Sequence, residues 1–366
     1  MTVDPDTLAY PVEPAPEPIR LLGPDGRLVD GAEPTLTVEQ VVAAYKLMWL
    51  SRRIDERAFN LQRQGRLGTF SPTRGQEASV LGSGLALRPG TDWLVPQYRE
   101  LTAMLYHDQP IDLWFAYWMG HMQGSATPDT LRILPTQIAL AAQLPHAVGL
   151  AWGRKIQGFD EVVITYFGDG ASSEGDFHEA LNLAGVTKAP VIFLLQNNGW
   201  AISTPRSKQS AATSFAARGP GYGMPGVVVD GNDLLAVYEV SKRAAQRARD
   251  GLGPTLIESM TYRLGPHNTA DDSVRYMDAD ELERRELEDP VTRVRLYLDS
   301  HDAWNDDDEE ALAAEHKTII DEAVAAAEAH QPEPERLFDH VFAEPTHRLA
   351  DQRTQVLTNA RGGIHA

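Results

Sequence analysis

The chain has 366 residues, carries a formal net charge of −19 at pH 7 and contains no cysteine. Such an acidic surface repels nucleic acid, and a chain without cysteine has no disulfides, thiolate chemistry or thiolate-bound metals. We attribute the acidity to solubility, with a high-salt source as the alternative. No 20-residue apolar run and no secretory signal are visible, so we expect no membrane partner and a cytoplasmic location.

The first part of the chain is proline-rich and then becomes helical. Residues 1–34 lack hydrophobic periodicity, so we expect an extended arm with a short hairpin around residues 24–26. A capping-box pattern over Thr37–Gln40 predicts a helix that runs towards Gln64. The next expected elements are a helix over residues 75–87, a strand-like run over residues 93–100 and an alanine-rich helix over residues 135–155.

The following segments alternate between strands and helices, which is typical of an α/β fold with a mainly parallel sheet flanked by helices. The expected strands cover residues 162–167, 191–195, 227–230 and 255–262, and the expected helices cover residues 177–184 and 233–250. From Asp278 the chain is helical and charged. We therefore expect an arm (residues 1–34), an α/β domain (residues 35–275) and a helical tail packed on that domain (residues 276–366), with helical extensions at both ends of the α/β fold.

Polar residues follow two strands that are neighbours along the chain. Gly168-Asp169-Gly170 ends the first strand, and Asn197-Asn198 ends the second, with one helix between them. Parallel strands place both ends at the carboxyl edge of one sheet, where ligands of open α/β sheets bind. We therefore expect Asp169 and Asn198 to share a site.

The residue types at this edge suit a metal ion and a phosphate. Carboxylate and amide oxygens are hard ligands for Mg²⁺ or Ca²⁺, and Mg²⁺ completes its shell with substrate phosphates and water. Gly168 and Gly170 allow the backbone to approach a phosphate, and the following helix offers free N–H groups and a positive dipole end. The pattern predicts a metal–diphosphate site.

GDG followed, after residues 171–196, by NN is similar to the signature of thiamine-diphosphate enzymes. Over about residues 36–350 the chain also carries RGQEA, PQYRE, AISTP, VDGND, GPTLIE and YRLGPH. With these motifs it resembles the alpha subunit of the decarboxylating first component of 2-oxo acid dehydrogenase complexes. The resemblance implies a thiamine-diphosphate-binding fold, thiamine diphosphate and Mg²⁺ as cofactors, and oxidative decarboxylation of a 2-oxo acid.

The resemblance also assigns roles to individual positions. From spacing alone, Tyr98-Arg99 reads as a packed tyrosine beside a surface arginine, and core packing explains Ile138 and Leu140 nearly as well. The cofactor-binding positions that the resemblance implies are Tyr98, Arg99, Ile138, Leu140, Gly168, Asp169, Gly170, Ala171, Asn198, Arg263 and His267. The implied metal ligands are Asp169, Asn198 and the backbone carbonyl of Trp200.

Two histidines are catalytic candidates. His267 lies in the turn-rich, acidic segment GPHNTADD, which predicts an exposed, mobile loop, and histidine moves protons near neutral pH. The resemblance assigns His267 to catalysis in contact with cofactor and substrate, and gives His121 as a candidate for substrate contact. Asn268 stands where mammalian relatives carry a regulatory serine, so we expect no phosphorylation switch there, although Ser273 remains nearby.

The cofactor needs a glutamate at its aminopyrimidine end, and the sequence shows no second α/β module to supply it. The resemblance implies a separate beta subunit in an α2β2 heterotetramer, and a lipoyl-bearing acyltransferase component as acyl acceptor. Pyruvate and branched-chain 2-oxo acids are both compatible substrates, and an acetoin-cleaving enzyme or a non-catalytic regulatory subunit are the alternatives. A nicotinamide-binding motif and a P-loop fit poorly, because G-x-G-x-x-G lacks its third glycine and no Gly-Lys-Ser/Thr follows.

Overall fold

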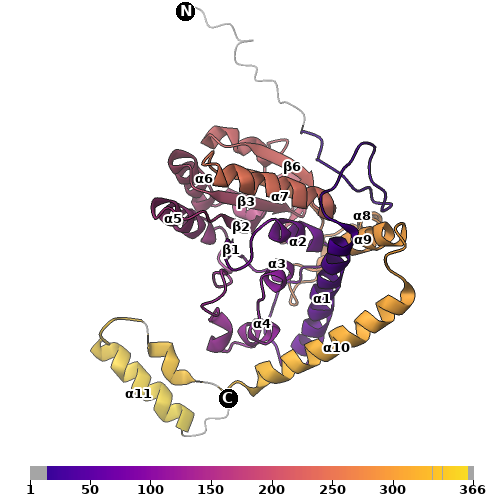
Figure 1. Ribbon diagram of the computed structural model, residues 1–366. Helices are drawn as coiled ribbons and strands as arrows, with labels where there is room; N and C mark the ends of the chain where they lie inside the picture. The colour runs from indigo at the N-terminus through magenta and orange to yellow at the C-terminus, as the bar shows by residue number, and fades with distance from the viewer. Residues whose placement is uncertain (1–14, 332, 340, 362–366) are drawn as a thin grey trace, which may run out of the picture.

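The computed structural model describes residues 15–331, 333–339 and 341–361. A five-stranded sheet lies at its centre, with the strand order β1-β2-β3-β7-β6 and every neighbouring pair parallel (Figure 1). The strands are β1 (Trp93–Val95), β2 (Val163–Gly168), β3 (Val191–Asn197), β6 (Gly226–Asp230) and β7 (Thr255–Met260). The predicted α/β fold with a mainly parallel sheet is confirmed.

Helices cover both faces of the sheet, because β2 and β3 alternate between two apolar faces. Phe167 and Phe193 pack with α5 (Gln143–Ile156) and α6 (Gly175–Thr187) in one core. Tyr166 and Leu194 point the other way. They pack with α2 (Glu77–Leu85), α3 (Leu101–Tyr106) and α7 (Leu234–Arg249) in the second core. The carboxyl ends of the strands therefore form an edge that lies between two helical layers.

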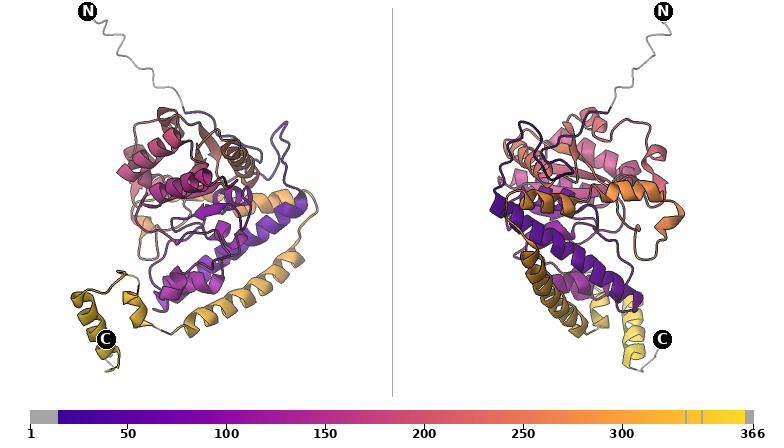
Figure 2. Two further views of the ribbon diagram at one scale, coloured as in Figure 1. Left: turned by 60° about the vertical axis from the view of Figure 1, so that its left-hand side comes forward. Right: turned by 90° about the vertical axis from the view of Figure 1, so that its right-hand side faces the viewer.

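The long helix α1 (Val38–Arg63) begins at the predicted capping box of Thr37 and Gln40. Helix α10 (Asp306–Ala329) runs beside α1 and α4 (Ile111–Trp118), whereas α11 (His347–Arg361) lies apart from the main body (Figure 2). The tail also contains α8 (Ala279–Glu286), α9 (Pro290–Asp299) and the 3-10 helix η8 (Pro334–Phe338), on which α11 packs. The other short elements are η2 (Met122–Ser125), η3 (Gly170–Ser173), β4 (Trp200–Ala201), β5 (Thr204–Pro205), η4 (Arg206–Lys208), η5 (Ala216–Arg218), η6 (Pro220–Tyr222) and η7 (Ser273–Arg275).

The helix predicted over residues 135–155 begins only at Gln143, so its first turns were predicted wrongly. The chain before it is extended beside β1, where the Leu134 N–H donates to Leu94 O and the Gln137 N–H to Gln97 O, both at 2.9 Å. β1 is an edge strand whose backbone groups need partners, and this pairing outweighs the helix propensity of the alanines.

The structure describes the predicted arm from Ala15 onward, and residues 1–14 lie outside the described residues. Ile19 forms a parallel bridge to Val229 and so lines the free edge of β6. The predicted hairpin around residues 24–26 is confirmed by the antiparallel bridge between Leu22 and Leu28. Among the described residues, no helix has both the length and the apolar character needed to cross a membrane.

Candidate active site

A cleft of about 490 Å³ opens at the carboxyl ends of β2 and β3, where the sequence predicts the metal–diphosphate site. All the predicted site residues except Arg263 and His121 line it: Tyr98, Arg99, Ile138, Leu140, Gly168, Asp169, Gly170, Ala171, Asn198, Trp200 and His267. These residues come from five separate segments, so the fold gathers them in three dimensions.

Glycine is needed for different physical reasons at the two positions, 168 and 170, of the turn at the end of β2. A Cβ built on Gly168 would meet no atom within 4 Å, so this glycine leaves open space in the cleft for a ligand. A Cβ on Gly170 would lie 2.8 Å from the Cβ of Ala201, so Gly170 serves close packing against β4. The helix predicted over residues 177–184 is confirmed by α6, which begins at Gly175, and η3 lies between this helix and the turn.

Asp169 is almost fully buried beside this turn. Burial raises the pKa of Asp169 to about 6, and a hydrogen bond from Gln209 acts against that rise. Gln209 Nε2 donates to Asp169 Oδ2 at 2.7 Å. A buried carboxylate with a single side-chain donor gains much from a bound cation, which favours its charged form.

Asn197 and Asn198 are adjacent but point to opposite sides of β3. Asn198 Nδ2 donates to Gln76 Oε1 at 3.1 Å, and Asn198 Oδ1 accepts the backbone N–H of Trp200 at 3.2 Å. Asn197 Nδ2 donates instead to the buried carboxylate of Glu258 at 2.7 Å. Asn198 therefore serves the cleft, and Asn197 anchors the turn to β7.

A buried carboxylate shapes the turn that carries Tyr98 and Arg99. Glu100 Oε2 accepts the backbone N–H groups of Gln97 and Arg99, both at 2.9 Å, and Oε1 accepts from Gln196 Nε2 at 2.7 Å. Burial raises the pKa of Glu100 to about 7. Glu100 thus connects the turn that carries Tyr98 and Arg99 to Gln196 of β3, two residues before Asn198.

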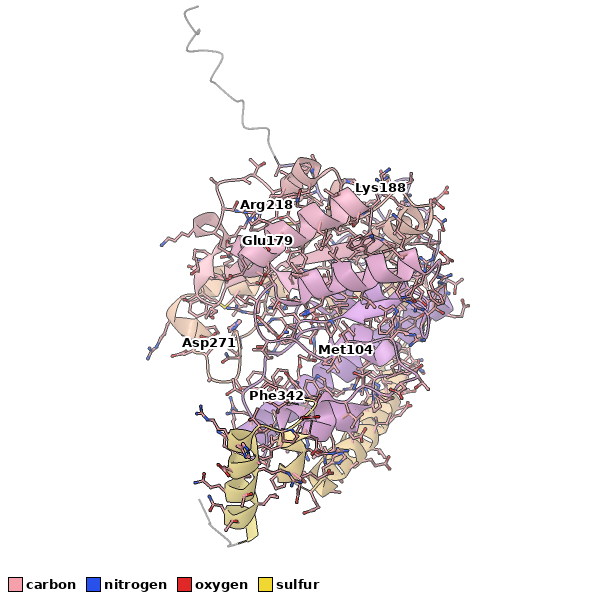
Figure 3. The ribbon with its side chains drawn as sticks, turned by 90° about the vertical axis from the view of Figure 1, so that its left-hand side faces the viewer. Met104, Glu179, Lys188, Arg218, Asp271 and Phe342 are labelled. Carbon is pink, nitrogen blue, oxygen red and sulfur yellow. The ribbon has the colours of Figure 1, made fainter. Side chains whose placement is uncertain are left out.

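The prediction that His267 lies in an exposed loop is wrong, because its side chain is partly buried. Arg99 Nη2 donates to the carbonyl of His267 at 2.7 Å and lies 3.1 Å from its Nδ1. Burial and the positive charges of Arg99 and Arg263 lower the pKa of His267 to about 4. The backbone N–H of His267 donates to Asp271, whose loop stands at the edge of the molecule (Figure 3). His267 is therefore neutral near pH 7.

Two predicted residues lie outside the cleft lining. Arg263 is buried behind it, where its guanidinium donates to the carbonyl of Ile202 at 2.9 Å and to the hydroxyl of Tyr276 at 2.7 Å. His121 follows α4, and its ring centroid lies 6.1 Å from that of His330. Direct contacts of Arg263 with a phosphate and of His121 with a substrate stay predictions.

The cleft residues fit a Mg²⁺–diphosphate group. In the described parts of the chain, the buried Nε2 atoms of Gln76 and Gln97 have no hydrogen-bond partner, although both residues line the cleft. Nowhere in the same residues do three or more His, Cys, Asp or Glu side chains gather to hold a metal. A metal bound by Asp169 and Asn198 would thus need ligand oxygens, which a diphosphate supplies.

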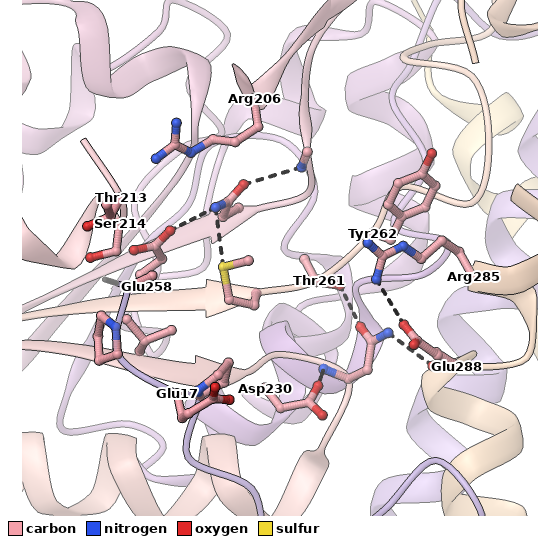
Figure 4. Close-up of a pocket in the computed structure, with 18 of the residues that line it drawn as sticks. Glu17, Arg206, Thr213, Ser214, Asp230, Glu258, Thr261, Tyr262, Arg285 and Glu288 are labelled. Carbon is pink, nitrogen blue, oxygen red and sulfur yellow. Dashed lines mark hydrogen bonds and ion pairs between the residues drawn. The ribbon is translucent and has the colours of Figure 1, made fainter. Parts of the chain in front are cut away.

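A larger cavity of about 770 Å³ lies on the other side of β3, at the ends of β6 and β7 (Figure 4). Several of its charged groups pair within the protein, although the buried Nε of Arg293 has no hydrogen-bond partner in the described residues. Glu258 accepts from Asn197 and from the backbone of Ala216, and Arg293 pairs with Asp230 at 2.9 Å. Size alone does not mark this cavity as a ligand site.

Sequence reasoning missed Gln76, Glu100, Gln209 and Glu258 as supporting residues. Gln76, Glu100 and Glu258 belong to the motifs RGQEA, PQYRE and GPTLIE, which was the available signal, whereas Gln209 stands in no such motif.

Comparison with known proteins identifies relatives along most of the chain. A family model described as dehydrogenase E1 component matches residues 45–335. The alpha subunit of the pyruvate dehydrogenase E1 component of Staphylococcus epidermidis is 42% identical over 339 residues, covering 92% of this chain and 91% of the relative. The alpha subunit of 3-methyl-2-oxobutanoate dehydrogenase of Mycobacterium tuberculosis is 44% identical over 345 residues, covering 93% of each chain.

Proposed function

Because the chain belongs to the family of dehydrogenase E1 components, we propose that it is the alpha subunit of a thiamine-diphosphate- and Mg²⁺-dependent 2-oxo acid dehydrogenase. It decarboxylates pyruvate or a branched-chain 2-oxo acid oxidatively, and the acyl group passes to a lipoyl group of the acyltransferase component. The observation that carries this proposal is the cleft in which Asp169 and Asn198 meet buried, unpartnered amide donors. The absence of cysteine is compatible with a cytoplasmic location.

The chain's own residues divide the work of binding. Asp169, the Asn198 side-chain oxygen and the Trp200 carbonyl hold Mg²⁺, while Tyr98 and Arg99 bind the diphosphate. When bound, thiamine diphosphate supplies the electron sink for loss of the carboxyl group. The burial of these residues excludes water and strengthens their electrostatic contacts with the diphosphate.

His267 is suited to hold a proton at a defined atom. An arginine can only donate, so the Arg99 contact makes Nδ1 of the neutral ring an acceptor. The proton of the neutral imidazole is then on Nε2, where it can be donated to a substrate oxygen or to the lipoyl group. Because its pKa is low, the ring of His267 is uncharged at pH 7.

A beta subunit completes the site. Ile138, Leu140 and Ile202 are exposed large apolar residues at the cleft. Exposed apolar side chains gathered beside an incomplete site are typical of a protein–protein interface. We assign this surface to the beta subunit of an α2β2 heterotetramer, which supplies the glutamate for the aminopyrimidine end.

The test is decarboxylation by the chain co-expressed with its beta subunit, with Mg²⁺ and thiamine diphosphate. Pyruvate is compared with 3-methyl-2-oxobutanoate, in the wild type and in Asp169→Ala. Loss of the metal ligand is expected to lower turnover at least about 100-fold, because a metal contributes several kcal/mol. A formed tetramer that turns over neither acid would contradict the proposal and favour acetoin cleavage or a non-catalytic role.

A further inference from the structure

Gln76 is a fully buried polar residue at the start of α2 that the predicted ligand set does not include. Its relative exposure is 0%, and it lines the cleft. It is separated from Asn198 by 122 positions in the sequence but contacts it directly.

The first function of Gln76 concerns the orientation of Asn198. An asparagine amide has a donor end and an acceptor end, and its neighbours decide which end faces a ligand. Gln76 Oε1 accepts the N–H of Asn198 Nδ2 at 3.1 Å, which fixes the donor end on Gln76. The carbonyl oxygen of Asn198 accepts the backbone N–H of Trp200 at 3.2 Å, and its second lone pair is then available to a cation.

The second function concerns the other end of Gln76. Within the described ranges, Gln76 Nε2 is buried and has no hydrogen-bond partner. An unpaired buried donor is costly, so its place in a cleft points to an acceptor that arrives with the ligand. Because the donor is an N–H group beside a cation site, a phosphate oxygen is the acceptor of matching chemistry.

The backbone under Gln76 is firmly held. Gly75 has a φ of +91°, and a Cβ there would lie 2.3 Å from the carbonyl oxygen of Tyr262, so the turn tolerates only glycine. The Gly75 N–H donates to the buried Glu77 side chain, which pairs with Arg52 at 2.7 Å. Gln76 therefore presents its amide from a fixed position.

We propose that Gln76 is a positioning and binding residue that orients Asn198 with its carbonyl oxygen and donates to the cofactor diphosphate with its amide nitrogen. This inference rests on the proposed function, since it assumes that the cleft takes a metal–diphosphate group. It adds a neutral contact that joins the metal ligand Asn198 to the diphosphate.

The experiment measures binding rather than activity, by titration calorimetry on the chain co-purified with its beta subunit. Two dissociation constants are determined, for Mg²⁺ at saturating thiamine diphosphate and for thiamine diphosphate at saturating Mg²⁺. Gln76→Leu removes both contacts and is expected to raise both constants about tenfold or more. Gln76→Glu keeps the acceptor for Asn198 but replaces the donor by an anion. It is expected to keep Mg²⁺ affinity within about threefold and to weaken thiamine diphosphate binding about tenfold.

The matched control is Gln143→Leu. Gln143 is also buried and donates to the carbonyl of Tyr166 at 2.6 Å, but it does not line the cleft. It is expected to change thermal stability without changing either dissociation constant. Wild-type affinities in Gln76→Leu, or parallel losses in both Gln76 variants that follow their melting temperatures, would overturn the inference. No binding of thiamine diphosphate by the wild type would instead overturn the proposed function.

Discussion

Two hollows flank the end of β3: the larger cavity, which Asn197 faces, and the smaller cleft, which Asn198 faces. The larger hollow, of about 770 Å³, is lined by charges that pair with one another, such as Arg293 with Asp230. The smaller, of about 490 Å³, holds a carboxylate with one side-chain donor. In the described chain it also holds two buried amide nitrogens, of Gln76 and Gln97, and one buried amide oxygen, of Gln196, that have no hydrogen-bond partner.

The buried Nε of Arg293 in the larger hollow also lacks a hydrogen-bond partner in the described chain. What distinguishes the smaller hollow is therefore the combination of unpartnered amide donors with a buried carboxylate that has one side-chain donor.

Breaking the pair in the larger hollow tests whether its charges are structural. Among the described residues, Arg293→Met leaves Asp230 with only the partly exposed Arg20 as ionic partner, so the free energy of unfolding is expected to fall by about 3–5 kcal/mol. Thiamine diphosphate affinity of the folded protein is expected to stay unchanged. Urea unfolding and titration calorimetry measure the two quantities, and a weaker cofactor affinity would break the comparison. The control Arg285→Met removes an exposed pair with Glu288 and should cost at most about 1 kcal/mol.

Glu100 tests the cost of a buried carboxyl under the smaller hollow. Its pKa rises from 4.5 to about 7 on folding, so between these pH values the folded state keeps a proton that the unfolded state has lost. Stability from this group is therefore full below pH 4.5 and falls as pH rises towards 7. Glu100→Gln removes the titration. Its unfolding free energy relative to wild type is expected to improve by up to about 3 kcal/mol from pH 5 to pH 8. Parallel pH profiles of the two proteins would contradict this assignment.

Alanine substitutions at Gly168 and Gly170 are expected to give the smallest effects. They distinguish a glycine that leaves room for a ligand from one that allows close packing. Gly168→Ala places a methyl group in the open cleft and is expected to weaken thiamine diphosphate binding about tenfold, with stability changed by less than about 1 kcal/mol. Gly170→Ala forces a shift of Ala201 and is expected to cost about 1–3 kcal/mol of stability. Melting temperatures and binding constants of both variants decide the matter. If Gly168→Ala destabilised the fold instead, the smaller hollow would not be open space.

The five strands of the central sheet, most helices and half of the cleft lining could be predicted from the sequence, although the strand expected over residues 93–100 ends at Val95. Strand ends are local patterns, whereas positions such as Tyr98 and Ile138 could be assigned only through the family resemblance.

The sequence could not predict the residues that hold the cleft lining in place. Gln76, Glu100 and Gln209 contact Asn198, Gln196 and Asp169 across sequence separations of 122, 96 and 40 residues. Contacts between residues so far apart in the chain produce no periodic pattern in the sequence from which they could be predicted. The false start of the helix at residue 135 has the same origin, because the partner of that segment is the distant strand β1.

The hydrogen bond from Gln209 to Asp169 also has a consequence in time. The amide occupies Oδ2 of Asp169, so a metal ion that binds this oxygen displaces Gln209 from it. Arg206 donates to the carbonyls of Ser210 and Ala212 on the far side of Gln209, so this segment is held together and is expected to move as one unit. The observed rate of cofactor loading is therefore expected to level off at high cofactor concentration. At high cofactor concentration, the movement of this loop, rather than the concentration of thiamine diphosphate, then limits how fast a newly made chain becomes active.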